Sequence, residues 1–155
     1  TTKKINESFL GKFSEFKHLF HGHTYTGNPT AAALSLKNIE LYEKYHLIEK
    51  IQKTSMVFEN RINDISNLDV VGEIRHKGMV MGIELVQNKN SNKPLSSKTS
   101  INKLVFDEGR KHQIYFRTLG NIIMLVPPLA ISRKDLNFLI DGTISTLKSI
   151  SRKLL

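Results

Sequence analysis

The chain has 155 residues, enough for one ordinary domain or for a part of a larger protein. Its 39% hydrophobic and 24% charged residues are typical of a soluble globular protein, and its longest apolar run, residues 122–126, is far too short to span a membrane. The net charge of +9 comes from scattered basic residues, without arginine-rich runs or zinc-finger spacing, so we expect neither a nucleic-acid nor a membrane partner. The absence of cysteine and of a signal-peptide core is compatible with a cytoplasmic protein.

The first predicted element is a short helix that Thr2 could cap and that reaches Leu10. Residues 11–19 are polar and aromatic, and we expect them to form a loop. The chain starts inside this amphipathic segment and without a methionine, so we expect it to be a fragment of a longer protein.

A stretch rich in glycine and polar groups, FHGHTYTGN at residues 20–28, precedes a helix predicted over residues 29–45. Asn28 is a favoured N-cap, and Pro29 suits the first helical position. The free N–H groups of such a helix start, together with the hydroxyls of Thr24, Tyr25 and Thr26, suit an anion such as phosphate. A glycine-rich connector that ends in a good cap is the other interpretation, and the local pattern leaves both open.

A second helix is predicted over residues 47–65, and since only His46 separates it from the first, the two could form one bent helix. The pattern then changes to strands over residues 70–75 and 79–86, joined by a turn at 76–78, which predicts an antiparallel hairpin. Residues 87–94 are polar and are expected to form an exposed loop.

The remaining predicted elements are a helix at 98–112, a strand at 114–117, a turn at 118–121, a buried strand at 122–126 that ends at two prolines, and a last helix that starts with a capping box at 132–135. Paired strands between helices predict an α+β fold, with a small antiparallel sheet and helices packed on one face.

Arg117 is a candidate binding residue because it ends the strand predicted at 114–117. An arginine fixed at the mouth of a hairpin can hold a carboxylate through two parallel hydrogen bonds. A surface arginine at a strand end is the other interpretation. His21 and His23 would share one face of an extended segment, but no third ligand has suitable spacing, so we predict no metal site.

Four motifs follow one another along the chain: FHGHTYTGNP with the alanine-rich helix start at 20–33, VGEIR at 71–75, GIELV at 82–86, and Arg117-x-x-Gly120 followed by Pro127-Pro128. In this order they resemble the C-terminal third of class III aminotransferases, which use pyridoxal 5′-phosphate on a fold-type I scaffold. The resemblance covers essentially the whole chain. It implies the end of the large-domain segment at 1–28, bridging helices at 29–66 and a small α+β domain at 67–155.

Within the class, the His-Gly motif is most similar to the biotin-synthesis branch. That branch converts 8-amino-7-oxononanoate to 7,8-diaminononanoate, and the resemblance favours S-adenosylmethionine as the amino donor. Aminotransferases of ω-amino acids or diamines have a similar helix start and the same arginine–glycine–proline-proline ending. A catalytically silent stand-alone module is the alternative from another class.

The resemblance also implies roles for single residues. Thr24 would bind the cofactor phosphate from the neighbouring subunit of a homodimer, and His23 would line the same site. Arg117 would hold the carboxylate of the oxononanoate substrate. Met124 departs from the family, because some members have a tyrosine there. The family's Schiff-base lysine is expected upstream of Thr1, so we predict no catalytic residue in this chain and no activity of the fragment alone.

Overall fold

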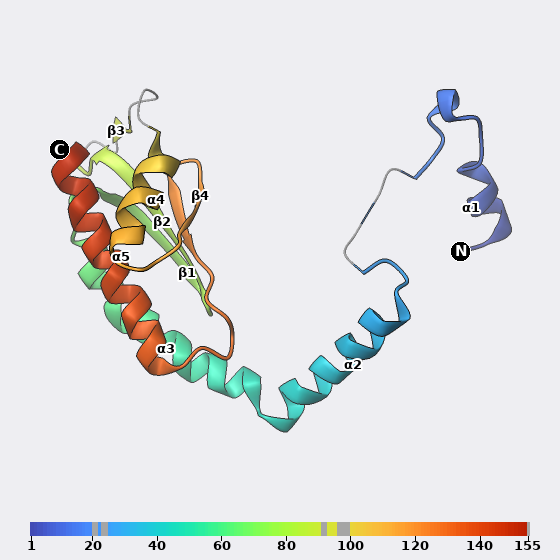
Figure 1. Ribbon diagram of the computed structural model, residues 1–155, viewed down its shortest axis with the longest axis horizontal. Helices are drawn as coiled ribbons and strands as arrows, with labels where there is room; N and C mark the ends of the chain where they lie inside the picture. The colour runs from blue at the N-terminus through green and yellow to red at the C-terminus, as the bar shows by residue number, and fades with distance from the viewer. Residues whose placement is uncertain (20–21, 23–24, 91–92, 96–99, 155) are drawn as a thin grey trace. The chain divides into compact units, whose positions relative to one another are not determined.

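The computed structural model describes residues 1–19, 22, 25–90, 93–95 and 100–154. The chain divides into two compact units, Thr1–Leu41 and Tyr42–Leu155, and each has its own internal contacts (Figure 1). The domain boundaries after residues 28 and 66 remain predictions. In the described part of the chain, no helix combines the length and the apolar character that crossing a membrane requires.

The first unit begins with the short helix α1 (Lys3–Ser8). The hydroxyl of Thr2 accepts a hydrogen bond from the N–H of Ile5 at 3.4 Å, which confirms the predicted cap, although the helix ends before Leu10. A 3₁₀ turn over Phe13–Glu15 lies inside the segment predicted as a loop. None of the residues described in this unit is buried.

The two long helices occupy the predicted ranges, as α2 (Pro29–Lys44) and α3 (Leu47–Ser66). They are separate helices and not one bent helix, because His46 between them has φ 48° and ψ 46°. This left-handed conformation cannot continue a right-handed helix.

The sheet lies in the second unit and has the strand order β1-β2-β5-β4, with every pair antiparallel. Its strands are β1 (Val71–Lys77), β2 (Val80–Asn88), β5 (Ile122–Leu125) and β4 (Arg117–Leu119). A short strand, β3 (Lys93–Pro94), pairs with β2. Two antiparallel hairpins, β1–β2 and β4–β5, therefore join through the β2–β5 pair.

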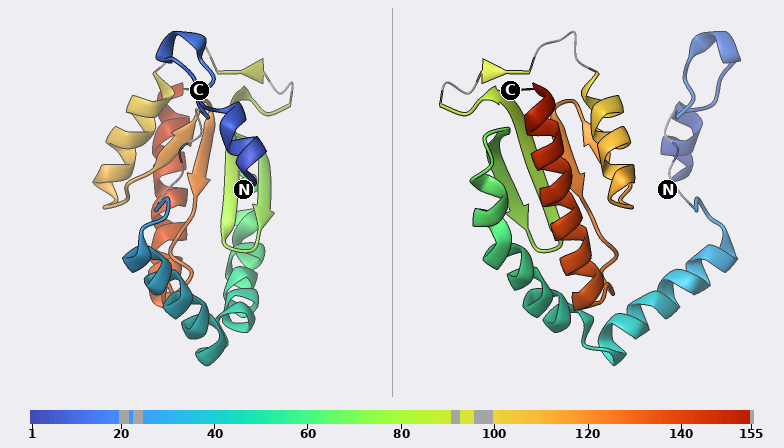
Figure 2. Two further views of the ribbon diagram at one scale, coloured as in Figure 1. Left: turned by 90° about the vertical axis from the view of Figure 1, so that its right-hand side faces the viewer. Right: turned by 60° about the vertical axis from the view of Figure 1, so that its left-hand side comes forward.

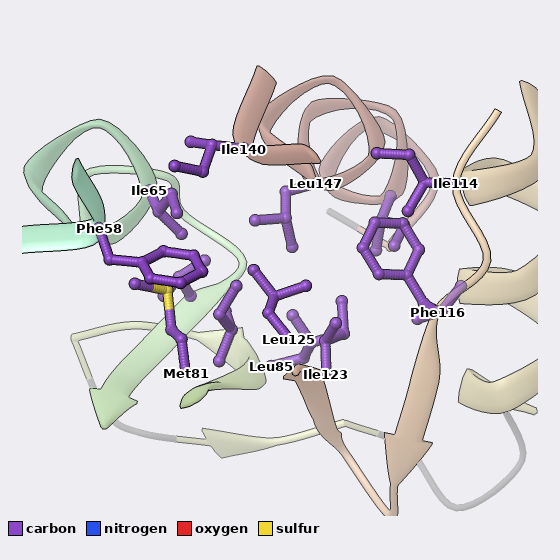
Figure 3. Close-up of a cluster of buried hydrophobic side chains, with 14 of the residues drawn as sticks. Phe58, Ile65, Met81, Leu85, Ile114, Phe116, Ile123, Leu125, Ile140 and Leu147 are labelled. Carbon is purple, nitrogen blue, oxygen red and sulfur yellow. The ribbon is translucent and has the colours of Figure 1, made fainter. Parts of the chain in front are cut away.

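Helices α3, α4 (Ile101–Lys111) and α5 (Arg133–Leu154) lie on one face of this sheet (Figure 2). The core between them contains strand residues on one side and helix residues on the other, among them Met81, Leu85, Leu125, Phe58 and Leu147 (Figure 3). All five are nearly or fully buried. The α+β prediction, with helices on one face of a small antiparallel sheet, is confirmed.

Two predicted connections of the sheet are wrong in detail. The first hairpin turns at Gly78 and Met79 and not at 76–78, since Lys77 already pairs with Val80. Gly78 has φ 56°, a conformation that glycine adopts without steric cost. Residues 87–94 are not all loop, because β2 continues to Asn88 and pairs with β3.

The strand predicted at 114–117 is also wrong, since β4 begins at Arg117 and pairs where a turn was expected. The reason is that this segment packs against glycines of the two helices α4 and α5. Ile114 lies against Gly142 of α5, and the ring of Phe116 lies against Gly109 of α4, so close that a Cβ on Gly109 would come within 2.4 Å of it. The N–H of Ile114 also bonds the carbonyl of Gly109 at 3.0 Å, which closes the end of α4.

Candidate functional site

The turn before α2 is the described part of the predicted phosphate segment. Thr24 and His23, the predicted cofactor residues, and His21 lie outside the described residues. The N–H of Asn28 donates to the carbonyl of Tyr25 at 2.8 Å, and the Asn28 side-chain oxygen accepts from the N–H of Ala31 at 3.1 Å. The predicted N-cap is therefore confirmed. Because the cap already bonds one of the N–H groups at the helix start, an anion there would depend more on the hydroxyls in front of it.

Arg117 lies at the start of the edge strand β4, directly opposite Met124 of β5. Its side chain is exposed, and within the described residues it makes no hydrogen bond or ion pair. The structure thus places Arg117 opposite Met124, the position at which the resemblance predicts a departure from the family. An unpaired guanidinium with five donors remains able to hold a carboxylate in bidentate geometry.

A hollow of about 490 Å³ opens beside Arg117. Its walls are mainly apolar and come from the segment before β4, from β5 and the two prolines after it, and from α5; they include Tyr115, Phe116, Val126, Pro127, Phe138 and Leu139. A cation at the edge of an apolar hollow suits an amphipathic anion, with the carboxylate on Arg117 and a hydrocarbon chain along the wall.

Sequence reasoning missed these wall residues except Pro127, which belongs to the motif that contains Arg117. Tyr115, which is 80% exposed, stands two positions before Arg117, and an aromatic side chain at that spacing could have indicated a shared face. Phe138 lies outside the apolar stripe of α5 and is exposed. An aromatic residue on the polar side of a helix is a usable signal for a binding surface.

The one buried carboxylate in the described core, Glu108 of α4, lies away from the hollow and is only 2% exposed. Its oxygen accepts hydrogen bonds from Lys111 at 2.8 Å and from Lys153 of α5. These bonds hold the pKa of Glu108 below its ordinary value, and the bond to Glu108 raises the pKa of Lys111. The contact ties α4 to α5 and is structural. Among the described residues, no cluster of three histidines or carboxylates could hold a metal ion.

Comparison with known proteins identifies the family of the chain. Residues 1–147 match the model of the family described as aminotransferase class III. Two similar proteins are adenosylmethionine-8-amino-7-oxononanoate aminotransferases, from Methanocaldococcus jannaschii with 38% identity over 96% of this chain and from Geobacter sulfurreducens with 33% identity over 97%. The chain spans about a third of the length of these relatives, 32% and 33% respectively.

Solved structures extend the likeness to the fold. The crystal structure of the M. jannaschii protein matches with a TM-score of 0.76 and 38% identity, covering 96% of this chain and 34% of that one. An omega transaminase from Pseudomonas jessenii, solved in complex with PMP, matches with a TM-score of 0.77 over 91% of this chain and 31% of that one. Its identity is 22%, so it shows the fold alone. The fold implied by the resemblance is confirmed.

Proposed function

Because this chain belongs to the class III aminotransferase family, we propose that it works as part of a longer, pyridoxal-phosphate-dependent enzyme of biotin synthesis. This enzyme would aminate 8-amino-7-oxononanoate to 7,8-diaminononanoate, with S-adenosylmethionine as the amino donor. Relatives that bear the name of this activity are 33–38% identical over nearly the whole chain. The observation that carries the proposal is Arg117 at the edge of an apolar hollow, without an ion-pair partner among the described residues.

In this function Arg117 binds and orients the substrate. Its guanidinium holds the carboxylate, and the neighbouring apolar wall excludes water from the hydrocarbon chain. Fixing the carboxylate end restricts how the distant reacting carbon can lie, and such positioning is a large part of the catalytic effect of binding. The residues of this chain thus provide substrate binding and not the bond-making group.

Pyridoxal phosphate, when bound, supplies the electron sink for the transfer of the amino group. The donor chemistry before α2 fits its phosphate, since hydroxyls precede a helix start and no acidic residue occurs between Glu15 and Glu40. In the proposed homodimer, Thr24 contacts the phosphate from the neighbouring subunit and His23 lines the same site. The anchoring lysine belongs to the part of the longer protein outside these 155 residues, so the chain alone is inactive.

Arg117→Ala tests the proposal. In the longer protein, this change should weaken binding of the oxononanoate by about 2–4 kcal/mol, because a charge-assisted bidentate pair is lost. The KM of amino transfer measures this loss, and Arg133→Ala, which removes an exposed arginine at the start of α5, is the matched control. Unchanged kinetics in Arg117→Ala would remove this residue from the substrate site.

Thr24→Ala tests the cofactor contact. We expect weaker binding of pyridoxal phosphate with little change in folding, since one hydroxyl donor to the phosphate is lost. A cofactor titration by absorbance measures the affinity. Ser35→Ala is the control, because it removes an exposed hydroxyl of α2 that bonds only its own helix. Normal cofactor affinity in Thr24→Ala would reject the phosphate role.

A second candidate is an ω-amino acid aminotransferase. It is favoured by 31% identity to a probable gamma-aminobutyrate transaminase of rice over 97% of this chain. A panel of the oxononanoate, ω-amino acids and diamines, assayed with the longer protein, separates the two. Turnover of ω-amino acids without turnover of the oxononanoate would favour the second candidate, and no turnover at all would favour a silent module.

A further inference from the structure

The side chain of Arg117 has no hydrogen-bond or ion-pair partner among the described residues, so its backbone alone sets the place from which the side chain leaves the sheet. That backbone is the three-residue edge strand β4, whose only partner in the sheet is β5. An edge strand this short has few bonds to hold it. The turn that joins β4 to β5 therefore matters for where the guanidinium lies.

Asn121 attaches this turn to β2. Its side-chain NH₂ donates to the carbonyl of Leu85 at 3.1 Å and to the carboxylate of Glu84 at 3.3 Å. Its own carbonyl accepts from the N–H of Leu85 at 2.9 Å. Leu85 is fully buried in the core, so these bonds connect the turn to a strand that cannot move easily.

Glu84 is itself held in place from the other side. Arg75 of β1 donates to the second oxygen of Glu84 at 3.2 Å and lies 3.7 Å from Glu73. Pairing places Arg75, Gly82, Met124 and Arg117 in one row across the four strands, on the same face of the sheet. Glu84 thus pairs with the arginine at one end of the row, whereas Arg117 at the other end has no ion-pair partner among the described residues.

We propose that Asn121, oriented by Glu84, is a positioning residue for Arg117 and holds the backbone of β4 at the place from which the guanidinium reaches a substrate carboxylate. The inference rests on the proposed function, in which Arg117 holds that carboxylate. Thr118 provides a second attachment of β4, through a 2.7 Å hydrogen bond to Asn102 of α4. The hairpin that carries Arg117 is therefore bonded to β2 through its turn and to α4 through the middle residue of β4.

Asn121→Ala in the longer protein tests this role, with KM and kcat measured for the carboxylate substrate and for its methyl ester. We expect KM to rise about five- to tenfold for the carboxylate, and less than about twofold for the ester, with kcat nearly unchanged. In an Arg117→Ala background, Asn121→Ala should add no further loss, because it acts through the missing guanidinium. Equal losses for acid and ester, or losses that add in the double variant, would overturn the proposal.

Three comparison variants make the outcome specific. Arg61→Ala removes the 2.7 Å ion pair with Asp141 that links α3 to α5, away from the walls of the hollow, and should leave the KM for the carboxylate unchanged if stability alone is not the cause. Glu84→Gln keeps an oxygen that can accept from Asn121, so it should raise the KM for the carboxylate less than Asn121→Ala does. A larger rise would contradict the proposed role of Asn121. Arg117→Ala alone reports on the proposed function. If Arg117→Ala leaves KM unchanged, both the proposed function and the positioning role of Asn121 are rejected. If Arg117→Ala raises KM as expected but Asn121→Ala raises KM equally for acid and ester, only the positioning role is rejected.

Discussion

The two units of the chain use similar helices with opposite results. In the first unit, α2 carries Leu34, Leu36 and Ile39, which are 66%, 65% and 58% exposed. In the second unit, α3 buries Phe58 and Ile65 completely. Both helices carry apolar residues at three- and four-residue steps, but among the residues that the structure describes, α3 packs on a sheet and a second helix while α2 buries none of its residues.

The difference shows that an apolar stripe predicts a helix and not its burial. Burial also needs a partner surface, which the second unit contains and the first unit lacks among its described residues. Tyr42–Leu155 therefore encloses a core of its own. In Thr1–Leu41 no described residue is buried, and local hydrogen bonds such as the caps at Thr2 and Asn28 hold its helices.

The largest effect on the unfolding free energy should come from truncating a large apolar residue of the second unit, compared with one of the first. Phe58→Ala empties a fully buried position and should cost about 3–5 kcal/mol of the unfolding free energy. Leu36→Ala removes an exposed side chain and should cost less than about 0.5 kcal/mol in the isolated chain. Urea unfolding followed by circular dichroism measures both, and similar losses would break the contrast between the units.

A smaller effect on the unfolding free energy should come from removing the helix cap at Ser132, compared with the cap at Asn28. Ser132 accepts from the N–H of Asp135 at 3.0 Å, and its removal should lower the unfolding free energy of the second unit by about 1 kcal/mol. Asn28→Ala removes the equivalent bond at α2 and should reduce helix content without lowering the stability of the core. A loss of core stability in Asn28→Ala would show that the first unit is coupled to the second more tightly than its exposed residues suggest.

The smallest effect should be a change in how stability depends on pH. Lysine hydrogen bonds lower the folded-state pKa of Glu108, so its contribution is present at neutral pH and is lost as the pH falls through that lowered value. Glu108→Gln should therefore make the fall in stability below about pH 4 less steep. Thermal unfolding between pH 2 and 7 measures this slope, with Glu59→Gln as the control for loss of one exposed carboxylate. An identical acid slope in Glu108→Gln would contradict the account.

Short-range signals allowed much of this fold to be predicted. The predicted caps at Ser132 and Asn28 are both observed, since each side-chain oxygen accepts from the N–H three residues later. The capping box is only half formed, because the Asp135 carboxylate accepts from the Ser132 hydroxyl and not from its N–H. The alternation in β2 placed Met81, Ile83 and Leu85 on one face, and all three are fully buried. These features depend on neighbours along the chain, which a sequence displays directly.

The position of β4 could not be predicted in the same way. Ile114 and Phe116 alternate with Tyr115 like strand residues, but they pack against Gly142 and Gly109 of two helices. That fit depends on residues up to 28 positions away and on the space that a missing side chain leaves, which no local pattern records. Arg117 was singled out by its place beside a turn, and its role with a carboxylate stays a prediction.

The most direct test of the central claim is a crystal structure of the longer protein with pyridoxal phosphate and 8-amino-7-oxononanoate bound. The account predicts that the substrate carboxylate lies about 3 Å from the guanidinium nitrogens of Arg117, in bidentate geometry, with the hydrocarbon chain against the hollow. A carboxylate held by other residues, with Arg117 directed into solvent, would contradict it.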